Sequence, residues 1–366
     1  RVVRVTFSAF LPAAPAASGI MFLVFLYSIP ANLSNDSTQQ NSLCSTDIPY
    51  VGMIATYIMI ISVLGIIFNV FVLMVFFFHK KPCTVAEIYL GNLAGADLLL
   101  TSFLPFWAVY VGNKFNWTFG KTMCRLTNTV IHMNANCSNY FLVLVSIDRY
   151  LALVHPLSHE TMRRPGFAKC GCLLVWGLGL LLSVPTIVYR KTQTDYSNVT
   201  ICFLDLDDKT YLTFQLVLIT FGFVIPICTI SFCTVKILKA LKNRMAEGVH
   251  AQKMENKATT LVPVVLLAFL ICWVPFHVMR ILSLLSRFKI VPGCDFYRNV
   301  AYSRQFFSYF AFFNSVLNPI LYVVVGKNFR KKAKELFKQW NTKRFTTTMT
   351  LYTRTTQMSM LQQKTS

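Results

Sequence analysis

The stretch "NYFLVLVSIDRYLALVHP", Asn139–Pro156, places an aspartate and an arginine side by side inside an apolar run. In the core of a water-soluble protein, desolvating Asp148 and Arg149 would usually cost more free energy than their attraction returns. At the edge of a membrane, the same pair meets water or a partner protein. The fold therefore depends on where the apolar chain around this pair lies.

The composition favours a membrane. The 366-residue chain is 55% hydrophobic and 13% charged, whereas soluble domains carry roughly 25% charged residues. Seven stretches have about 20 or more mostly apolar residues, the length that a helix needs to cross ~30 Å of hydrocarbon. In lipid the backbone must satisfy its own hydrogen bonds, so each stretch must be helical. We predict an all-α membrane protein, a seven-transmembrane helix bundle, with spans at Val51–Phe78, Val85–Val111, Leu126–Val154, Cys170–Val188, Tyr211–Val235, Thr260–Leu285 and Val300–Val325.

The net charge of +21 is concentrated in alternate loops and after the last span. The positive-inside rule puts these segments in the cytosol. Glycosylation sequons fall on the other side, at Asn32, Asn35, Asn116 and Asn198. We expect a multi-pass plasma-membrane protein with the N-terminus outside and the C-terminus in the cytosol. Its basic charge then contacts anionic lipids rather than nucleic acid.

Four regions follow from this topology. Residues 1–50 form an extracellular segment, 51–325 the bundle, 326–340 an amphipathic helix on the membrane surface, and 341–366 a Thr-rich cytoplasmic tail that we expect to be disordered. Within residues 1–31, Gly19–Ala31 resembles the core of a signal peptide. Residues 1–20 are alternatively an extension of the predicted gene, with Met21 as the real start.

Two disulfides are expected on the oxidising side. Cys124 lies at the outer start of the third span and Cys202 in the loop between the fourth and fifth, so both face the outside. Cys44 and Cys294 are the other two clearly extracellular cysteines, and we expect them to pair. The 25 residues from Cys124 to Arg149 extend about 37 Å as a helix, which puts Asp148 and Arg149 at the cytoplasmic mouth of the bundle.

Polar residues inside the spans indicate a cation site. Asp97 is costly in hydrocarbon and should face the bundle interior. Asn134 and Ser138 are four residues apart and share one helical face. With Asp97, Asn314, Ser315 and Asn318 they could surround a sodium ion, the only cofactor that we expect. The alternative is that the Asn and Ser side chains only join helices together.

Prolines within the spans suggest hinges. "CWVPF", Cys272–Phe276, puts Trp273 close to Pro275, and "NPILY", Asn318–Tyr322, contains Pro319. A proline removes one helical hydrogen bond and allows a kink. These kinks serve either packing alone or a bundle that switches between two states.

The pattern resembles the rhodopsin-like (class A) G-protein-coupled receptors. The resemblance covers Val51 to about Lys338 and rests on Asn69, "LAGAD" to Asp97, Cys124, "DRY" at Asp148–Tyr150, Trp176, Pro226, "CWVP" and "NPILY". Within that class the chain is similar to bradykinin (kinin) receptors, in "CTVAEIYLGNLAGADLLL" (Cys83–Leu100), "LPFWA" (Leu104–Ala108), "LVSIDRYLALV" (Leu144–Val154) and "VVGKNFRKK" (Val324–Lys332). Angiotensin receptors share much of this pattern.

This resemblance implies a receptor without catalysis. An extracellular kinin-type peptide would activate a heterotrimeric G protein of the phospholipase C and calcium class, with receptor kinases and arrestin acting on the tail. The alternatives are a receptor for an angiotensin-like peptide and, more distantly, a transporter. A transporter is disfavoured because the sequence lacks inverted repeats. An enzyme is disfavoured because no HExxH or GxSxG motif occurs in a span.

The expected peptide pocket departs from the kinin pattern. Its residues are Trp107, His132, Arg190, Trp273, Phe276, Arg280, Arg304 and Gln305. Kinin receptors carry acidic residues near the outer ends of the sixth and seventh spans, where this chain has Ser283 and Ala301. Arginine forks suit carboxylates, so we expect Arg190, with Arg304 or Arg280, to bind the C-terminal carboxylate of the peptide.

The resemblance also implies a switch at the cytoplasmic mouth. On activation, Arg149 would leave Asp148 and Glu255, and a cavity for the G protein would open. The residues expected to form the switch are Asp148, Arg149, Tyr150, Glu255, Asn318, Pro319 and Tyr322.

Overall fold

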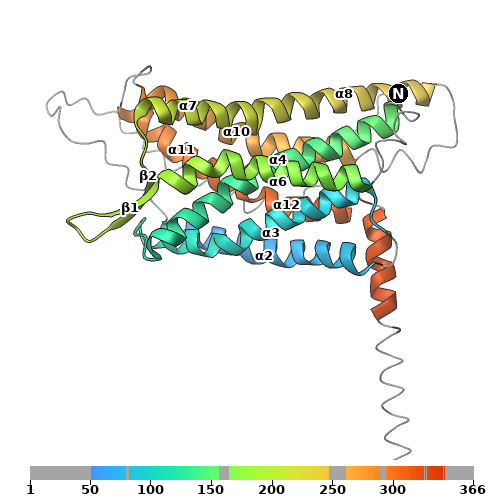
Figure 1. Ribbon diagram of the computed structural model, residues 1–366, viewed down its shortest axis with the longest axis horizontal. Coiled ribbons are helices and arrows are strands. Elements are labelled where there is room, and N and C mark those ends of the chain that lie inside the picture. Colours follow the sequence, from blue (N-terminus) through green and yellow to red (C-terminus); the bar gives the residue numbers. More distant parts are fainter. Residues whose placement is uncertain are drawn as a thin grey trace, which may run out of the picture. The chain divides into compact units, whose positions relative to one another are not determined.

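The structure, a computed structural model, describes residues 51–79, 82–155, 165–246, 261–288, 290, 294–324, 326, 328–340 and 342. Within this part of the chain, seven helical stretches are long and apolar enough to cross a membrane. Figure 1 shows them lying side by side as a bundle. The prediction of an all-α seven-span fold is confirmed.

In the described part of the chain, the elements follow one another as helices interrupted by one hairpin. In chain order they are α2 (Val51–Phe78), α3 (Val85–Gly112), α4 (Gly120–Val154), α6 (Pro165–Tyr189), β1 (Arg190–Thr194), β2 (Thr200–Leu204), α7 (Asp208–Ile219), the π-helical turn η2 (Thr220–Val224), α8 (Ile225–Ala246), α10 (Leu261–Arg287), α11 (Cys294–Phe312) and α12 (Asn314–Val324). A last helix covers residues 328–340.

The helices extend beyond the apolar stretches that predict them. The third span begins at Gly120 rather than Leu126, and the fourth at Pro165 rather than Cys170. Helical hydrogen bonding does not require apolar side chains, so a span continues into the polar interface. The seventh span is also not one unbroken helix, because a turn at Phe313 separates α11 from α12.

The β1–β2 hairpin was not predicted from the sequence. Its strands pair antiparallel with Arg190 opposite Leu204 and Thr192 opposite Cys202. The disulfide between Cys124 and Cys202 joins β2 to the start of α4. Trp117 adds a second tie, since its backbone N–H donates to the Thr200 carbonyl at 2.7 Å. We call this the hairpin end of the bundle (Figure 1).

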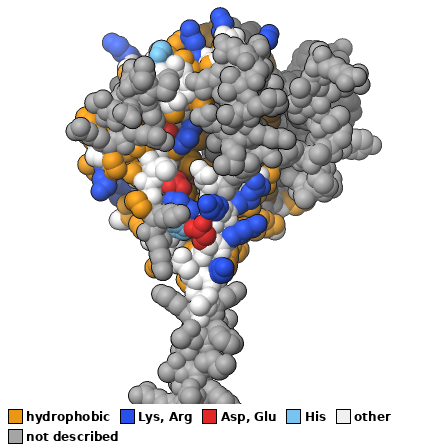
Figure 2. All heavy atoms as spheres, turned by 90° about the vertical axis from the view of Figure 1, so that its right-hand side faces the viewer, with side chains coloured by type: hydrophobic (Ala, Val, Ile, Leu, Met, Phe, Trp, Pro, Cys, Tyr) orange, Lys and Arg blue, Asp and Glu red, His pale blue; other side chains and the backbone are white. Residues whose placement is uncertain are grey.

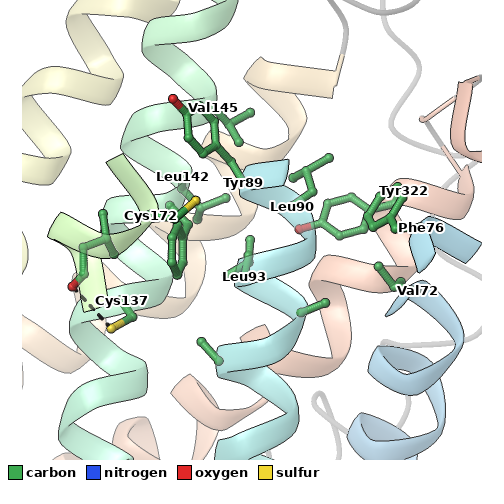
Figure 3. Packing of buried hydrophobic residues seen from close by; sticks show 14 of the residues in the cluster. Val72, Phe76, Tyr89, Leu90, Leu93, Cys137, Leu142, Val145, Cys172 and Tyr322 are labelled. Carbon is green, nitrogen blue, oxygen red and sulfur yellow. Dashed lines mark hydrogen bonds between the residues drawn. The ribbon is translucent and has the colours of Figure 1, made fainter. Parts of the chain in front are cut away.

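The core lies around α3 and α4. Leu90 and Leu93 on α3 belong to one buried cluster with Val72 and Phe76 of α2 and Leu142 and Val145 of α4 (Figure 3). Cys137 on α4 donates to the Val175 carbonyl of α6 at 3.7 Å. Trp176 on α6 also reaches α3, where its indole N–H donates to the Asn92 side chain at 3.0 Å. These contacts fix α3 and α4 as the centre of the bundle.

The helix of residues 328–340 packs at the opposite end of the bundle. Phe329, Ala333 and Leu336 are buried at helical spacing, and the Phe329 ring contacts Phe76 edge-on at 5.6 Å. Lys332 pairs with Glu87 at 2.8 Å, while Glu335 lies 2.8 Å from His79. One face is therefore buried, and Arg330, Lys331, Lys334 and Lys338 are exposed, while Phe337 is 49% exposed. Figure 2 shows Lys and Arg side chains gathered on this end.

Close packing of α6 against α4 gives a stability test. A Cβ at Gly179 would collide with the Cys137 sulfur, whereas a Cβ at Gly177 on the same helix would meet nothing within 4 Å. Overpacking of this kind costs ~1–3 kcal/mol. We expect Gly179→Ala to lower the thermal unfolding temperature of the purified protein, and Gly177→Ala to leave it unchanged or raise it slightly.

The same contact predicts a rescue. With Cys137 shortened to alanine, the nearest side-chain atom to the new methyl group is the Cβ of residue 137 at 3.9 Å, an ordinary contact. The double variant Cys137→Ala with Gly179→Ala should therefore be more stable than Gly179→Ala alone. Equal or additive losses in the double variant would contradict this packing.

Candidate functional site

The first candidate site is a fully buried carboxylate at the centre of the bundle. Asp97 on α3 has no exposed surface. Its Oδ1 accepts hydrogen bonds from Asn134 Nδ2 at 2.9 Å and Ser138 Oγ at 3.1 Å, both on α4. The same Oδ1 accepts from Ser315 Oγ at 2.9 Å, and Oδ2 accepts from Asn318 Nδ2 at 2.9 Å. We call these five residues the Asp97 cluster.

The cluster brings together most of the residues that the sequence suggested. Asn134 and Ser138 face α3 because they lie one turn apart on α4, and Asn134 Nδ2 also approaches Ser138 Oγ at 3.1 Å. Asn318 is fixed one turn beyond Ser315 on α12. Asn314 is also buried, but no hydrogen bond joins it to Asp97 in the described part of the chain. Asn69 extends the network, since it donates to the Ser315 carbonyl at 2.9 Å.

The donor set fits a small hard cation. Two hydroxyl oxygens, Ser138 Oγ and Ser315 Oγ, converge on one carboxylate oxygen, and a hydroxyl can turn a lone pair toward an ion. The Asn134 amide can present its oxygen instead of its nitrogen after rotation. Asp97 would supply the negative charge. These oxygen donors would suit a monovalent cation.

The second candidate site lies near the hairpin end and is cationic. Arg190 and Arg280 both lie within electrostatic range of His132, and Arg304 lies within range of Arg280. Among the described residues, no carboxylate pairs with any of these three arginines. Burial lowers the pKa of Arg190 to about 10, and its guanidinium is still charged at neutral pH. The site therefore attracts an anionic group.

Two of these arginines, Arg190 and Arg280, are held by neutral partners, and Arg304 is exposed. Arg190 Nη2 donates to the Asn128 side chain, while its Nε is buried and has no hydrogen-bond partner among the described residues. Arg280 Nε donates to Gln215 Oε1 at 2.6 Å, and its guanidinium lies over the Phe276 ring at 5.9 Å. These neutral partners hold the guanidinium groups in place and leave their positive charge unpaired.

Aromatic side chains line the same region. Phe276 contacts Trp273 edge-on at 5.7 Å, and Trp107 contacts Tyr110 at 5.4 Å. Gln305 on α11 has a buried side-chain oxygen without a partner in the described chain. The structure brings Trp273 and Phe276 together with His132 and Arg280 around one cavity. Trp107, Arg190, Arg304 and Gln305 are not among the residues that line this cavity.

Sequence reasoning missed part of that cavity. Asn136 and Asn139 on α4, and Gly222 in the π-helical turn, also line it. His277 belongs to the same lining. The two asparagines lie three residues apart, so helical spacing could have put them on one face. Sequence spacing does not show which neighbouring helix that face meets.

The third group lies at the opposite end from the hairpin. Arg149 Nη2 lies 3.4 Å from Asp148 Oδ2, and 29% of the Arg149 side chain is exposed. The Tyr150 hydroxyl lies 3.0 Å from His155 Nε2. Pro319 and Tyr322 lie on α12, and Tyr322 is buried beside Phe329. Glu255 lies outside the described residues.

The expected disulfides and glycosylation sites have different outcomes. The Cys124–Cys202 bond is present. The Cys44–Cys294 pair stays a prediction, because Cys44 and the side chain of Cys294 lie outside the description, as do Asn32 and Asn35. Asn198 is exposed in the hairpin turn. Asn116 is half-buried, and its Oδ1 accepts from the Thr200 backbone N–H at 2.9 Å.

These sites occur in a known kind of protein. The family described as 7 transmembrane receptor (rhodopsin family) matches residues 68–322. The chain belongs to this family of G-protein-coupled receptors, whose members are receptors and not enzymes, and it is a multi-pass membrane protein with seven spans.

Within the family, the chain is similar to bradykinin receptors. It is 46% identical over 289 residues to the mouse (Mus musculus) B2 bradykinin receptor, an alignment that covers 78% of this chain and 74% of that receptor. The human (Homo sapiens) B2 bradykinin receptor is 46% identical over 286 residues, 77% of this chain and 73% of the receptor. The human B1 bradykinin receptor is 38% identical over 291 residues, 78% and 82% of the two chains.

The Asp97 cluster generates a prediction about sodium. We propose that sodium bound by this cluster holds the resting state, so that sodium lowers agonist affinity. Replacing Asp97 by Asn removes the charge and should abolish the effect of sodium on agonist affinity, measured by radioligand competition in sodium and in an organic cation of equal ionic strength.

A matched pair of serines on α4 provides the control. Ser138→Ala removes a hydroxyl that contacts Asp97, whereas Ser146→Ala removes one whose hydrogen bond, among the described residues, goes to the Leu142 carbonyl of its own helix. The first change should weaken the sodium effect and the second should not. Full sodium sensitivity in the Asp97→Asn variant would place the cation site elsewhere.

Proposed function

We propose that this protein is a plasma-membrane receptor for a short peptide of the kinin type, with the hairpin end outside the cell. The observation that carries the proposal is its 46% identity to the mouse B2 bradykinin receptor over 289 residues. The unneutralised arginines near the hairpin end support it, because they suit a ligand with an anionic group. The exposed Asn198 in the hairpin turn supports the orientation, since its sequon would be glycosylated outside the cell.

The arginines favour one end of the peptide. A guanidinium binds a carboxylate with two parallel hydrogen bonds, and the Nε of Arg190 has no partner among the described residues. The C-terminal carboxylate of the peptide would pair with Arg190, with Arg280 or Arg304 assisting. Its basic N-terminus would then matter less than for receptors with acidic residues where Ser283 and Ala301 stand here.

Peptide binding would be coupled to the opposite end through α10. Contact of the peptide near Trp273 favours movement of α10 around Pro275, and Arg149 then leaves Asp148. A cavity opens there for a heterotrimeric G protein, of the class that activates phospholipase C and releases calcium. The peptide shifts the equilibrium only by its preference for the open state. Each ~1.4 kcal/mol of tighter binding to that state raises the ratio of open to closed receptor tenfold.

Receptor kinases and arrestin would act afterwards. The tail 341–366 is rich in threonine, and phosphate groups there would give arrestin an acidic surface to bind. The basic residues of the 328–340 helix would lie against anionic lipids of the inner leaflet.

Calcium release tests the function directly. Cells that express the receptor should release calcium in response to bradykinin, and cells that express a variant with Arg149→Ala should not, at equal surface expression. A panel should include angiotensin peptides as the competing class. A response to angiotensins without a response to kinins would replace the kinin proposal with an angiotensin-like one.

The carboxylate contact gives a second prediction. Removing one member of a desolvated charge pair costs ~2–5 kcal/mol, so Arg190→Ala should weaken agonist binding by roughly 30-fold or more. Amidation of the agonist's C-terminus should have a similar effect on the unmodified receptor. The two changes together should cost much less than their sum, because each removes the same contact.

The neighbouring residue serves as the control. Lys191 is exposed and pairs with Asp205 at 2.6 Å, and exposed ion pairs contribute little. Lys191→Ala should therefore leave agonist affinity nearly unchanged. An amidated agonist that kept its full potency on the unmodified receptor would refute the carboxylate contact.

A further inference from the structure

The helix of residues 328–340 reaches both ends of the connection between α2 and α3. Lys332 Nζ donates to Glu87 Oε2 at 2.8 Å, in the first turn of α3. Three residues further along, Glu335 Oε2 lies 2.8 Å from Nε2 of His79, which directly follows α2. Residues three apart lie on one face of a helix, so the same face makes both contacts. Figure 2 shows acidic side chains among the basic ones at this end of the molecule. We call the two contacts the helix latch.

The latch is sheltered from water. The side chains of Lys332 and Glu87 are 12% and 9% exposed, and that of His79 is 2% exposed. Glu335 is the most open member, at 35%. Removing one member of a sheltered ion pair destabilises a protein much more than removing one member of an exposed pair. These contacts can therefore decide where the helix lies, whereas exposed pairs could not.

Glu87 has other partners besides Lys332. Its Oε2 accepts from the Thr84 backbone N–H at 2.7 Å and from the Thr84 hydroxyl at 3.0 Å. These bonds belong to a capping box, which stabilises the first turn of α3 and does not involve Lys332. If Lys332 moved away, its ammonium group would return to water and the Glu87 carboxylate would keep two hydrogen bonds. The Lys332–Glu87 contact can therefore open without leaving a buried carboxylate that lacks hydrogen bonds.

The same helix contacts a residue of the expected switch. The Phe329 ring contacts the Phe76 ring of α2 at 5.6 Å and the Tyr322 ring of α12 at 6.4 Å. The joint between α12 and the helix is tight, because the Gly326 N–H donates to the Tyr322 carbonyl at 3.0 Å and a Cβ at Gly326 would collide with that carbonyl. A helix held by the latch therefore presents a fixed neighbour to Tyr322, which is 1% exposed.

We propose that the helix latch restrains the resting receptor by holding residues 328–340 against α2 and α3, and that it opens when Tyr322 moves during activation. A change that weakens the latch lowers the free energy needed to leave the resting state. More of the receptor is then active without agonist. This effect on signalling rests on the proposed function as a receptor that activates a G protein.

The first test measures the latch without any peptide. Amide hydrogen exchange of residues 328–340 is followed by mass spectrometry on the purified full-length receptor, in nanodiscs of zwitterionic phosphatidylcholine. Lys332→Gln and Glu87→Gln each remove one charge of the pair, and a glutamine at position 87 can still complete a capping box. We expect each change to speed the exchange of this helix about 10-fold, because its local opening becomes more favourable.

Lys334→Gln is the matched control. It removes the same charge from the same helix, but Lys334 is exposed, so exchange should stay unchanged. Glu335→Gln weakens the second contact at the most open member of the latch and should also speed exchange. The double variant Glu87→Gln with Lys332→Gln should exchange no faster than the faster single variant, because both changes remove the same contact.

The second test measures signalling without agonist. Nucleotide exchange on a purified heterotrimeric G protein of the calcium-releasing class is followed with each receptor variant in the same nanodiscs. Glu87→Gln and Lys332→Gln should raise the basal rate about 5-fold, at the lower end of the usual coupling between two sites. Lys334→Gln should leave the basal rate unchanged.

The outcomes separate this inference from the proposed function. Unchanged exchange of residues 328–340 in Lys332→Gln and Glu335→Gln overturns the latch, whichever peptide is the agonist. Faster exchange of this helix with an unchanged or lower basal rate overturns its role as a restraint. A basal rate that rises in the latch variants of a receptor that no kinin activates upholds the latch and refutes the kinin assignment.

Discussion

The buried carboxylate of Asp97 is the constraint on which the arrangement of the bundle depends. A charge in the middle of a span is tolerated only when other groups bond to it. Here the groups come from α4 and α12, which approach α3 from two sides. Asn69 ties α2 to the same region through the Ser315 carbonyl. A shift of one residue in α12 would turn its side chains by about 100° and remove both of its bonds to Asp97.

Polar groups continue from this cluster toward the hairpin end. Asn136 and Asn139 are on the same helix as Asn134 and Ser138 but face the π-helical turn instead of α3. Nearer the hairpin end lie His132 and Arg280, which are within electrostatic range of Arg190 and Arg304 respectively. Helix α4 therefore contributes to the Asp97 cluster on one face and to the cavity lined by His132, Asn136 and Asn139 on another. Any ligand that moves α4 affects both sites, and this coupling must act equally in both directions.

Much of this could be predicted from the sequence, because lipid leaves few alternatives. Continuous apolar stretches predict the spans, and the four-residue spacing of Asn134 and Ser138 puts them on one face. The hairpin could not be predicted, since "RKTQT" has no apolar alternation and its pairing depends on the disulfide and on Trp117. The turn at Phe313 has no glycine or proline next to it. Asn139 was missed because its partner is a backbone carbonyl, Gly222, which leaves no mark in the sequence.

The π-helical turn Thr220–Val224 has a consequence for the span that contains it. The Ile225 N–H bonds to the Thr220 carbonyl five residues back, and α4 satisfies the carbonyls of Phe221 and Gly222 through Tyr140 and Asn139. A π turn accommodates one extra residue, which advances the following helix by about 100°. The directions in which the side chains of the two halves face are therefore set separately. Gln215 and Leu218 set the direction of the half before the turn, and the contact of Phe232 with Tyr150 sets that of the half after it. A chimaeric receptor joined within this span would keep both faces aligned only if the junction preserved the residue count of the turn.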